Sequence, residues 1–201
     1  MTPGTGPDQG EWTSEERIAL LELARASLEG AVLRQKPGRS VPPSERLSQP
    51  RGAFVTLTLG GELRGCIGYI RAVKPLWTAV AEMAVQAGLH DPRFMPVTQA
   101  ELPSLEYEIS VLTPMERVSQ PEQIEVGRDG LMIVKGMYSG LLLPQVATEY
   151  GWDRETLLDQ TCLKAGLSPQ AWRQGADIYR FSATVFSERS ERLEPAGPKD
   201  D

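Results

Sequence analysis

The sequence predicts an α+β fold, a mainly antiparallel sheet with packed helices, and it leaves room for a small second lobe. Three observations support this class. Two β-rich runs flank a Gly-Gly pair, later segments alternate apolar and polar residues, and the helical runs do not alternate regularly with the strands. Because regular βαβ alternation is missing, antiparallel pairing is favoured over a parallel sheet.

The first predicted element is a helix with Thr13 or Ser14 as its cap. Two glutamates follow in the first turn, where negative charge suits the helix dipole. Apolar residues recur at helical spacing as far as Leu28. We expect this helix to end near Gly30 or a few residues later.

A β-hairpin is predicted next, from residues 53–59 and 63–70. Gly60 and Gly61 separate the two runs, and such a pair readily takes the positive φ values of a tight turn. The alternation within each run then decides which side chains share a face of the sheet.

The middle of the chain predicts a helix over residues 76–89, stopped by Asp91-Pro92. Residues 104–112 alternate apolar and polar positions, which indicates a half-buried strand. Short strands are predicted over residues 124–126, 131–135 and 139–143, and a closing strand over 178–186. A helix capped by Asp153 should carry Cys162 on its inward side, and Ser168-Pro169 should open a short helical turn.

The predicted domain covers residues 13–187, with flexible tails at 1–12 and 188–201. Residues 36–50 contain four prolines and few apolar side chains, so we expect an extended surface loop there. A chain of 201 residues can bury about one substantial core.

Composition argues against two classes of partner. The net charge is -6, which opposes the counterion-driven binding of nucleic acid. The apolar runs are all shorter than the roughly 20 residues that a membrane span needs. The first ten residues do not resemble a secretory signal, so we expect the protein in the cytoplasm.

Metal-binding residues are scarce. Cys66 and Cys162 are the only cysteines and His90 is the only histidine, so one chain cannot supply the four Cys or His ligands of a structural zinc site. A disulfide framework is excluded too. A carboxylate-rich metal site stays open, although no metal is predicted and no cofactor is indicated.

The second strand of the hairpin carries the first candidate site. Strict alternation places Arg64 and Cys66 on one face, where a guanidinium favours the thiolate form of the sulfur. Gly65 and Gly68 leave the backbone uncovered, which suits close approach of a ligand or another segment. Alternatively, Cys66 is a small buried apolar residue and Arg64 pairs with a nearby carboxylate. The strand alone favours this structural interpretation.

Residues 90–94 form the second candidate. His90 could shuttle protons, and Asp91 with Arg93 could line the end of a cleft. The alternative is that Asp91 and Arg93 only fix the loop, while His90 is exposed. For His90 the structural role is favoured.

Two carboxylates form the third candidate. Glu106 and Glu108 lie two residues apart on one strand face, a spacing that suits acid–base chemistry or a hard metal ion. More often such a face is simply the wet side of a sheet. Glu108 is also the expected counter-ion for an arginine on a strand. Gln145 lies on a later helical segment, where a single polar residue is usually solvated.

The run LRGCIG at residues 63–68 resembles the signature of the AMMECR-one family, also known as AmmeMemoRadiSam system protein A. Other segments are similar to family blocks: residues 52–57, 91–94 with Pro96, 108–112, 140–147, 151–153 and 162–167. The resemblance covers about residues 15–188. It implies a compact α+β domain with a cleft toward which the signature strand faces.

The resemblance also implies a set of site residues and partners. It reverses the balance for Cys66 in favour of function, and His90 falls where the family would not require histidine. The implied catalytic residues are Cys66, Arg64 and Glu108, and the implied ligand-binding residues are Gly65, Gly68, Asp91, Arg93 and Gln145. The implied partners, from genomic association in prokaryotes, are a Memo-like protein and a radical-SAM protein.

Two hypotheses follow from these residues. In the first, the protein is an enzyme or enzyme subunit that uses Cys66 as nucleophile or redox thiol beside Arg64, with Glu108 or Asp91 setting protonation. In the second, the same face is a non-catalytic module that binds a small anionic ligand or a partner's loop. Neither hypothesis identifies a substrate or a reaction.

Overall fold

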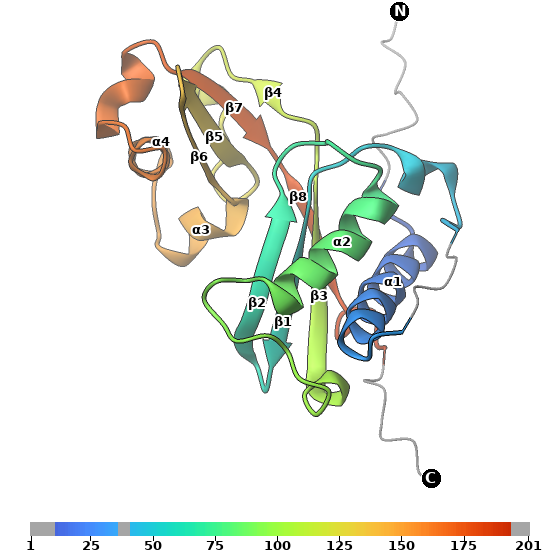
Figure 1. The fold of residues 1–201 in the computed structure, drawn as a ribbon. Coiled ribbons are helices and arrows are strands. Elements are labelled where there is room, and N and C mark those ends of the chain that lie inside the picture. The colour runs from blue at the N-terminus through green and yellow to red at the C-terminus, as the bar shows by residue number, and fades with distance from the viewer. Residues whose placement is uncertain (1–10, 36–40, 194–201) are drawn as a thin grey trace, which may run out of the picture. The chain divides into compact units, whose positions relative to one another are not determined.

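The computed structural model of the protein describes residues 11–35 and 41–193, shown in Figure 1. They form two compact units. Unit 1 combines the described residues up to Val111 with those from Thr184 onward, and unit 2 runs from Leu112 to Ala183. Both units contain helices and antiparallel strands, which confirms the α+β class. Most of the two predicted tails, and residues 36–40 of the predicted loop, lie outside the described residues.

Unit 1 is a four-stranded sheet with two helices on one face (Figure 1). Its strands lie in the order β2-β1-β3-β8. The bounds are β1 Ala53–Leu59, β2 Glu62–Tyr69, β3 Leu105–Leu112, β8 Ala183–Ser187, α1 Ser14–Val32 and α2 Leu76–Leu89, with short 3-10 helices η1 Glu45–Ser48 and η2 Leu102–Ser104.

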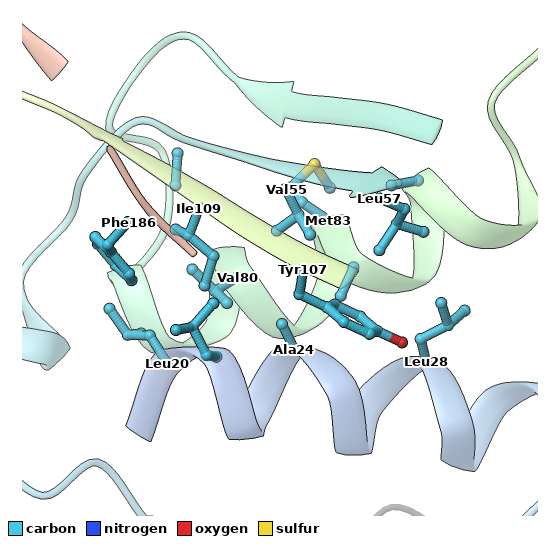
Figure 2. Packing of buried hydrophobic residues seen from close by; sticks show 14 of the residues in the cluster. Leu20, Ala24, Leu28, Val55, Leu57, Val80, Met83, Tyr107, Ile109 and Phe186 are labelled. Atoms are coloured by element: carbon cyan, nitrogen blue, oxygen red, sulfur yellow. The ribbon is translucent and has the colours of Figure 1, made fainter. Parts of the chain in front are cut away.

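The core of unit 1 lies between this sheet and its two helices (Figure 2). Alternate side chains of β1 and β3 point toward the helices, as the period of two requires. Figure 2 labels Val55, Leu57, Tyr107, Ile109 and Phe186 from the strands, with Leu20, Ala24, Leu28, Val80 and Met83 from the helices. Each large apolar side chain buried here contributes about 1.5–3 kcal/mol before entropic costs.

Helix α1 begins as predicted. The Glu16 N–H donates to Thr13 Oγ1 at 3.2 Å, and the Thr13 N–H donates to the Glu16 carboxylate at 3.1 Å. This reciprocal capping box satisfies two backbone donors that a helix start leaves free. The helix ends at Val32, two residues past Gly30.

Glu188, just after β8, joins the end of unit 1 to its beginning. Its carboxylate is buried and accepts from Arg25 Nε at 2.7 Å and from the Tyr107 N–H at 3.0 Å. Arg25 also donates to the Leu105 carbonyl at 2.8 Å. Residues from α1, β3 and the segment after β8 therefore share one buried charge pair.

The predicted hairpin is confirmed, with one departure. Gly60 and Gly61 have φ values of +60° and +84°, which a tight turn between β1 and β2 requires. The register shifts between Leu57, which pairs with Gly65, and Thr58, which pairs with Leu63. Arg64 is thus the extra residue of a β-bulge. Strict alternation, the basis for placing Arg64 on the same face as Cys66, does not hold across this position.

Unit 2 is a second four-stranded sheet, in the order β4-β7-β5-β6. Its elements are β4 Glu116–Arg117, β5 Gly130–Lys135, β6 Tyr138–Leu142, β7 Asp177–Phe181, α3 Pro144–Glu149 and α4 Arg154–Lys164, with η3 Pro121–Gln123 and η4 Pro169–Arg173. Asp153 caps α4 through the Thr156 N–H at 2.8 Å, as predicted. Cys162 is fully buried among Leu157 and Leu158, which confirms its assignment to a core.

Two predictions for the C-terminal half were wrong. Residues 178–186 form two strands in different sheets, because the chain leaves β7 at Ser182 and joins β8. There the Ser182 N–H donates to Thr113 Oγ1 at 2.8 Å, and the Ser182 carbonyl accepts from the Thr113 N–H at 2.9 Å. Residues 124–126 form no strand, since the Glu125 N–H closes a turn by donating to Asp129 at 2.9 Å.

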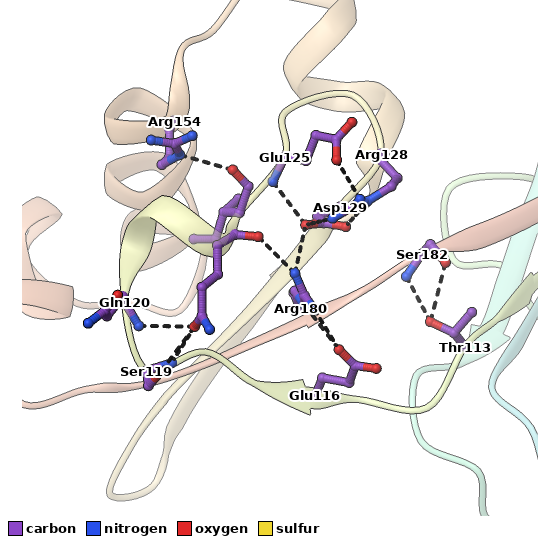
Figure 3. A network of polar contacts seen from close by, with 12 residues as sticks. Thr113, Glu116, Ser119, Gln120, Glu125, Arg128, Asp129, Arg154, Arg180 and Ser182 are labelled. Carbon is purple, nitrogen blue, oxygen red and sulfur yellow. Dashed lines mark hydrogen bonds and ion pairs between the residues drawn. The ribbon is translucent and has the colours of Figure 1, made fainter. Parts of the chain in front are cut away.

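A network of charged groups holds the β4 side of unit 2 (Figure 3). Arg180 of β7 donates to Glu116 of β4 at 2.9 Å and to the Gln123 carbonyl at 2.8 Å. Asp129 is buried and accepts from Arg128 Nε at 2.8 Å. The two-residue strand β4 thus depends on side-chain contacts as well as on its backbone hydrogen bonds to β7.

Within the described ranges, no helix is both long enough and apolar enough to cross a bilayer.

Candidate functional site

Cys66 lies on β2, the edge strand of the unit 1 sheet, and its backbone is bound by the loop that follows α2. Its N–H donates to Asp91 Oδ2 at 2.9 Å, and its carbonyl accepts from Arg93 Nη2 at 3.2 Å. An edge strand otherwise presents unpaired backbone groups. Asp91 and Arg93 therefore complete the sheet edge at the cysteine itself.

The Cys66 side chain lies on the sheet face away from α1 and α2. Its neighbour Gly65 faces α2, and successive side chains of a strand point to opposite faces. Cys66 is half-buried, and the Thr56 hydroxyl donates to its sulfur at 3.3 Å. Thr56 pairs with Cys66 on one side and with Glu108 on the other. These three residues form a row across β2, β1 and β3, here called the Cys66 row.

Glu108 ends this row as a half-buried carboxyl group. In the described part of the chain it makes no hydrogen bond or ion pair, and burial raises its pKa. Its predicted companion Glu106 is exposed. Two strand spacings, about 10 Å, separate Glu108 from Cys66, so a small group could lie above Thr56 between them.

Asp91 is a buried carboxylate whose hydrogen bonds go to the sheet edge and to Arg93. Besides the Cys66 N–H, it accepts from Arg93 N at 3.1 Å, Nε at 2.9 Å and Nη2 at 2.7 Å. The Arg93 guanidinium holds the pKa of Asp91 well below its usual range. About half of the Arg93 side chain remains exposed. Asp91 therefore positions Arg93 next to the cysteine.

Arg64 pairs with Glu101, a residue that the sequence did not single out. The two meet at 2.8 Å, and the guanidinium lowers the pKa of Glu101 to about 2. The expectation that Glu108 serves as the arginine's counter-ion was wrong, because the bulge at Arg64 directs its hydrogen bonds to the loop after α2. Arg64 Nη1 is buried without a hydrogen-bond partner among the described residues. No spacing rule connects Glu101 to Arg64, since their contact depends on how that loop folds.

The two glycines of the signature have close neighbours within the chain. A Cβ at Gly65 would lie 2.2 Å from the Ala87 carbonyl oxygen of α2, and one at Gly68 would lie 2.3 Å from the Phe54 ring. The sequence predicted that either a ligand or another segment approaches these glycines closely. In the structure α2 approaches Gly65 and Phe54 approaches Gly68. Their role in ligand binding stays a prediction.

The remaining predicted residues, His90 and Gln145, make none of the contacts described above. His90 is exposed at the end of α2. Gln145 is exposed on α3 of unit 2, whereas the other predicted site residues belong to unit 1. Among the described residues, no three His, Cys, Asp or Glu side chains gather in a group that could hold a metal.

The fold and the site define an α+β protein with a half-buried thiol on an edge strand that a charged loop completes. The AMMECR1 family model matches residues 21–186. The chain is 45% identical to protein MJ0810 of Methanocaldococcus jannaschii, covering 92% of this chain and 94% of that one. It is 44% identical to a Thermococcus onnurineus protein, covering 89% and 91%.

A solved structure supports the same assignment. The crystal structure of the uncharacterized protein PH0010 from Pyrococcus horikoshii matches with a TM-score of 0.74 and 41% identity, over 89% of this chain and 92% of that one. The chain belongs to the AMMECR1 family, as the LRGCIG run predicted.

Proposed function

We propose that the protein is an enzyme or enzyme subunit whose nucleophile is Cys66 and whose site is the Cys66 row. One observation carries this proposal. A half-buried sulfur that accepts a hydrogen bond from Thr56 shares its row with a carboxyl group, Glu108, that makes no hydrogen bond or ion pair among the described residues. The Glu108 carboxylate oxygens reach solvent, so they are accessible to a bound group.

The proposed reaction is attack by the Cys66 sulfur on an electrophilic carbon. As the sulfur–carbon bond forms, the thiol proton passes to Glu108 through one bridging water, because the two residues lie two strands apart. When the bond to the leaving group breaks, Glu108 returns that proton to the departing atom. Water then cleaves the sulfur–carbon bond, giving its hydroxyl to the carbon and its proton to the sulfur. The pKa of Glu108 is raised by burial, which brings this carboxyl closer to the range where a group can both accept and donate a proton.

The two arginines take different roles in this proposal. Arg93 is half-exposed beside the Cys66 carbonyl, so it is the guanidinium placed to orient an anionic substrate group. Arg64 instead fixes the loop through Glu101 and acts as a positioning residue. The cleft that encloses the site and the Memo-like and radical-SAM partners join the proposal from the family resemblance alone, whereas the cytoplasmic location is the expectation from the sequence.

The test is the rate at which iodoacetamide alkylates Cys66 in the folded protein at pH 7. We expect it to exceed the rate for a cysteine peptide of the same local sequence at least tenfold. Thr56→Val should return it toward the peptide rate, since the variant keeps the shape and loses the hydroxyl. Alkylation no faster than in the peptide would contradict the proposal.

A second candidate function is a non-catalytic binding module. The observation that favours it is that Arg64, Glu101, Asp91 and Arg93 pair with one another and hold a loop. Pull-down with the Memo-like and radical-SAM proteins separates the two candidates. In a binding module, Arg64→Ala abolishes capture while Cys66→Ser leaves it unchanged, whereas in an enzyme Cys66→Ser removes the reaction.

A further inference from the structure

Unit 2 contains an open hollow of about 620 Å³, in a part of the molecule that the proposed reaction does not use. It lies between the β5–β6 turn and the segment that links α4 to η4. Its lining consists of residues 135–138, Leu167, Ser168 and Ala171. This volume falls within the range of about 300–1,000 Å³ typical of small-molecule sites.

The walls of the hollow are held by contacts within the unit. A Cβ at Gly140 of β6 would lie 2.3 Å from the backbone nitrogen of Ala165, so β6 lies directly against the end of α4. Lys135 Nζ donates to the Gln174 carbonyl at 3.0 Å, which joins the end of β5 to the residue after η4. The hollow is therefore preformed, and a ligand needs little ordering of its walls.

The rim exposes apolar side chains. Gly136, with φ of +60°, and Met137 make the two-residue turn between β5 and β6. Met137 is fully exposed and Tyr138 is 58% exposed. Large apolar side chains that gather beside a hollow are typical of a surface that binds an apolar group.

Charge selects the class of ligand. None of the described residues that line the hollow is acidic, and Lys135 forms no ion pair within the described ranges. Its ammonium group is the single charge among the lining residues that the structure describes, and its hydrogen bond there is to a neutral carbonyl. We propose that this hollow binds a small aromatic or aliphatic carboxylate, with the apolar body against Tyr138 and Leu167 and the carboxylate at Lys135.

The experiment is calorimetric titration with 1-naphthoate and with its uncharged isostere 1-naphthamide. We expect saturable one-to-one binding of 1-naphthoate, at least about fivefold tighter than 1-naphthamide, as one solvent-accessible ion pair allows. Lys135→Gln keeps a donor for Gln174 and should make the two affinities equal. Equal affinities in the unaltered protein would overturn the assignment of a carboxylate.

A second pair of variants locates the binding. Ser168→Trp fills the hollow from an exposed position on its lining, and it should weaken 1-naphthoate at least tenfold. Gln170→Trp places the same side chain at an exposed η4 position outside the lining and should bind as the unaltered protein does. Undiminished binding by Ser168→Trp, or no binding by the unaltered protein, would overturn the proposal.

Discussion

The two cysteines of this chain occupy opposite surroundings. Cys66 is half-buried on an edge strand, with a hydroxyl donating to its sulfur and a charged loop bound to its backbone. Cys162 is fully buried on α4 among leucines, and burial raises its pKa. The Cys66 side chain meets a polar hydroxyl, whereas the Cys162 side chain meets apolar groups that disfavour a charged sulfur.

This difference shows that the groups around each cysteine, rather than the residue type, set the two cysteines apart. Residue type is identical in the two places, and both sulfurs lie in regular secondary structure. Only Cys66 has Asp91 and Arg93 bound to its own backbone. We therefore expect changes to that loop, to β2 and to the Cys66 row to alter the surroundings of Cys66 and not those of Cys162.

The largest expected effect is in thiol accessibility. Cys66 should react with iodoacetamide at least about a thousandfold faster than Cys162, because the buried thiol reacts only from opened states that are about 10⁻³ to 10⁻⁶ populated. Mass spectrometry of the labelled peptides measures both rates in one sample. Comparable rates in the folded protein would remove the contrast, and labelling in urea gives the control in which both react alike.

The next effect concerns the packing of β2 on α2. Gly65→Ala should destabilise the protein by about 3 kcal/mol or more, because the new Cβ meets backbone rather than a flexible side chain. Urea unfolding measures this change. The matched control is Gly30→Ala in α1, where no atom lies within 4 Å, and it should stabilise by about 0.5–1 kcal/mol. A Gly65→Ala variant as stable as the unaltered protein would mean that β2 can shift away from α2 without a cost in free energy.

The third effect isolates the Arg64–Glu101 pair. Glu101→Gln should cost about 2 kcal/mol at pH 7, since it leaves a largely buried guanidinium without its counter-ion. A carboxylate whose pKa is lowered on folding adds stability above its unfolded pKa and loses it as pH falls toward the folded value. The difference in unfolding free energy between the unaltered protein and the Glu101→Gln variant should thus fade between about pH 4.5 and pH 2.

Urea unfolding at several pH values tests this, with Glu82→Gln as the control. Glu82 pairs with Lys74 at the surface, so Glu82→Gln should change the free energy of unfolding little. A cost for Glu101→Gln that persists undiminished at pH 2 would show that lost packing, not charge, causes it.

The smallest effect is expected at Glu108. Its raised pKa means that folding disfavours the charged form, so its stabilising contribution exists below the unfolded pKa and is lost as pH rises. Glu108→Gln should therefore stabilise the protein by less than about 1 kcal/mol at pH 7 and leave it unchanged at pH 4. Glu106→Gln, at an exposed position on the same strand, is the control. Destabilisation by Glu108→Gln at pH 7 would indicate an internal partner for Glu108.

Local patterns predicted most elements of the fold. The helix over residues 76–89 has the predicted bounds, and the Gly60-Gly61 turn and the Asp153 cap follow from short-range chemistry. The division into two sheets was missed because residues 178–186 alternate without interruption. Only the pairing of Thr113 with Ser182, distant in sequence, breaks that run into two strands.

The candidate site was predictable in part. Alternation correctly placed Gly65 and Ile67 on the face opposite Cys66. The bulge at Arg64 has no signal in composition, so the partner of that arginine was misassigned. Thr56 was missed for the same reason, because pairing the two strands directly across their turn places Val55 opposite Cys66, and only the bulge brings Thr56 there.

The position of Glu188 has a consequence for biosynthesis. A ribosome releases all of residues 112–183 before the rest of β8 and Glu188 emerge, so the second unit has its complete sequence while the first still lacks most of its last strand. Until then Arg25 has no Glu188 carboxylate to bind. Nascent chains halted before residue 184 should therefore contain a protease-resistant C-terminal unit alongside an N-terminal portion that stays digestible.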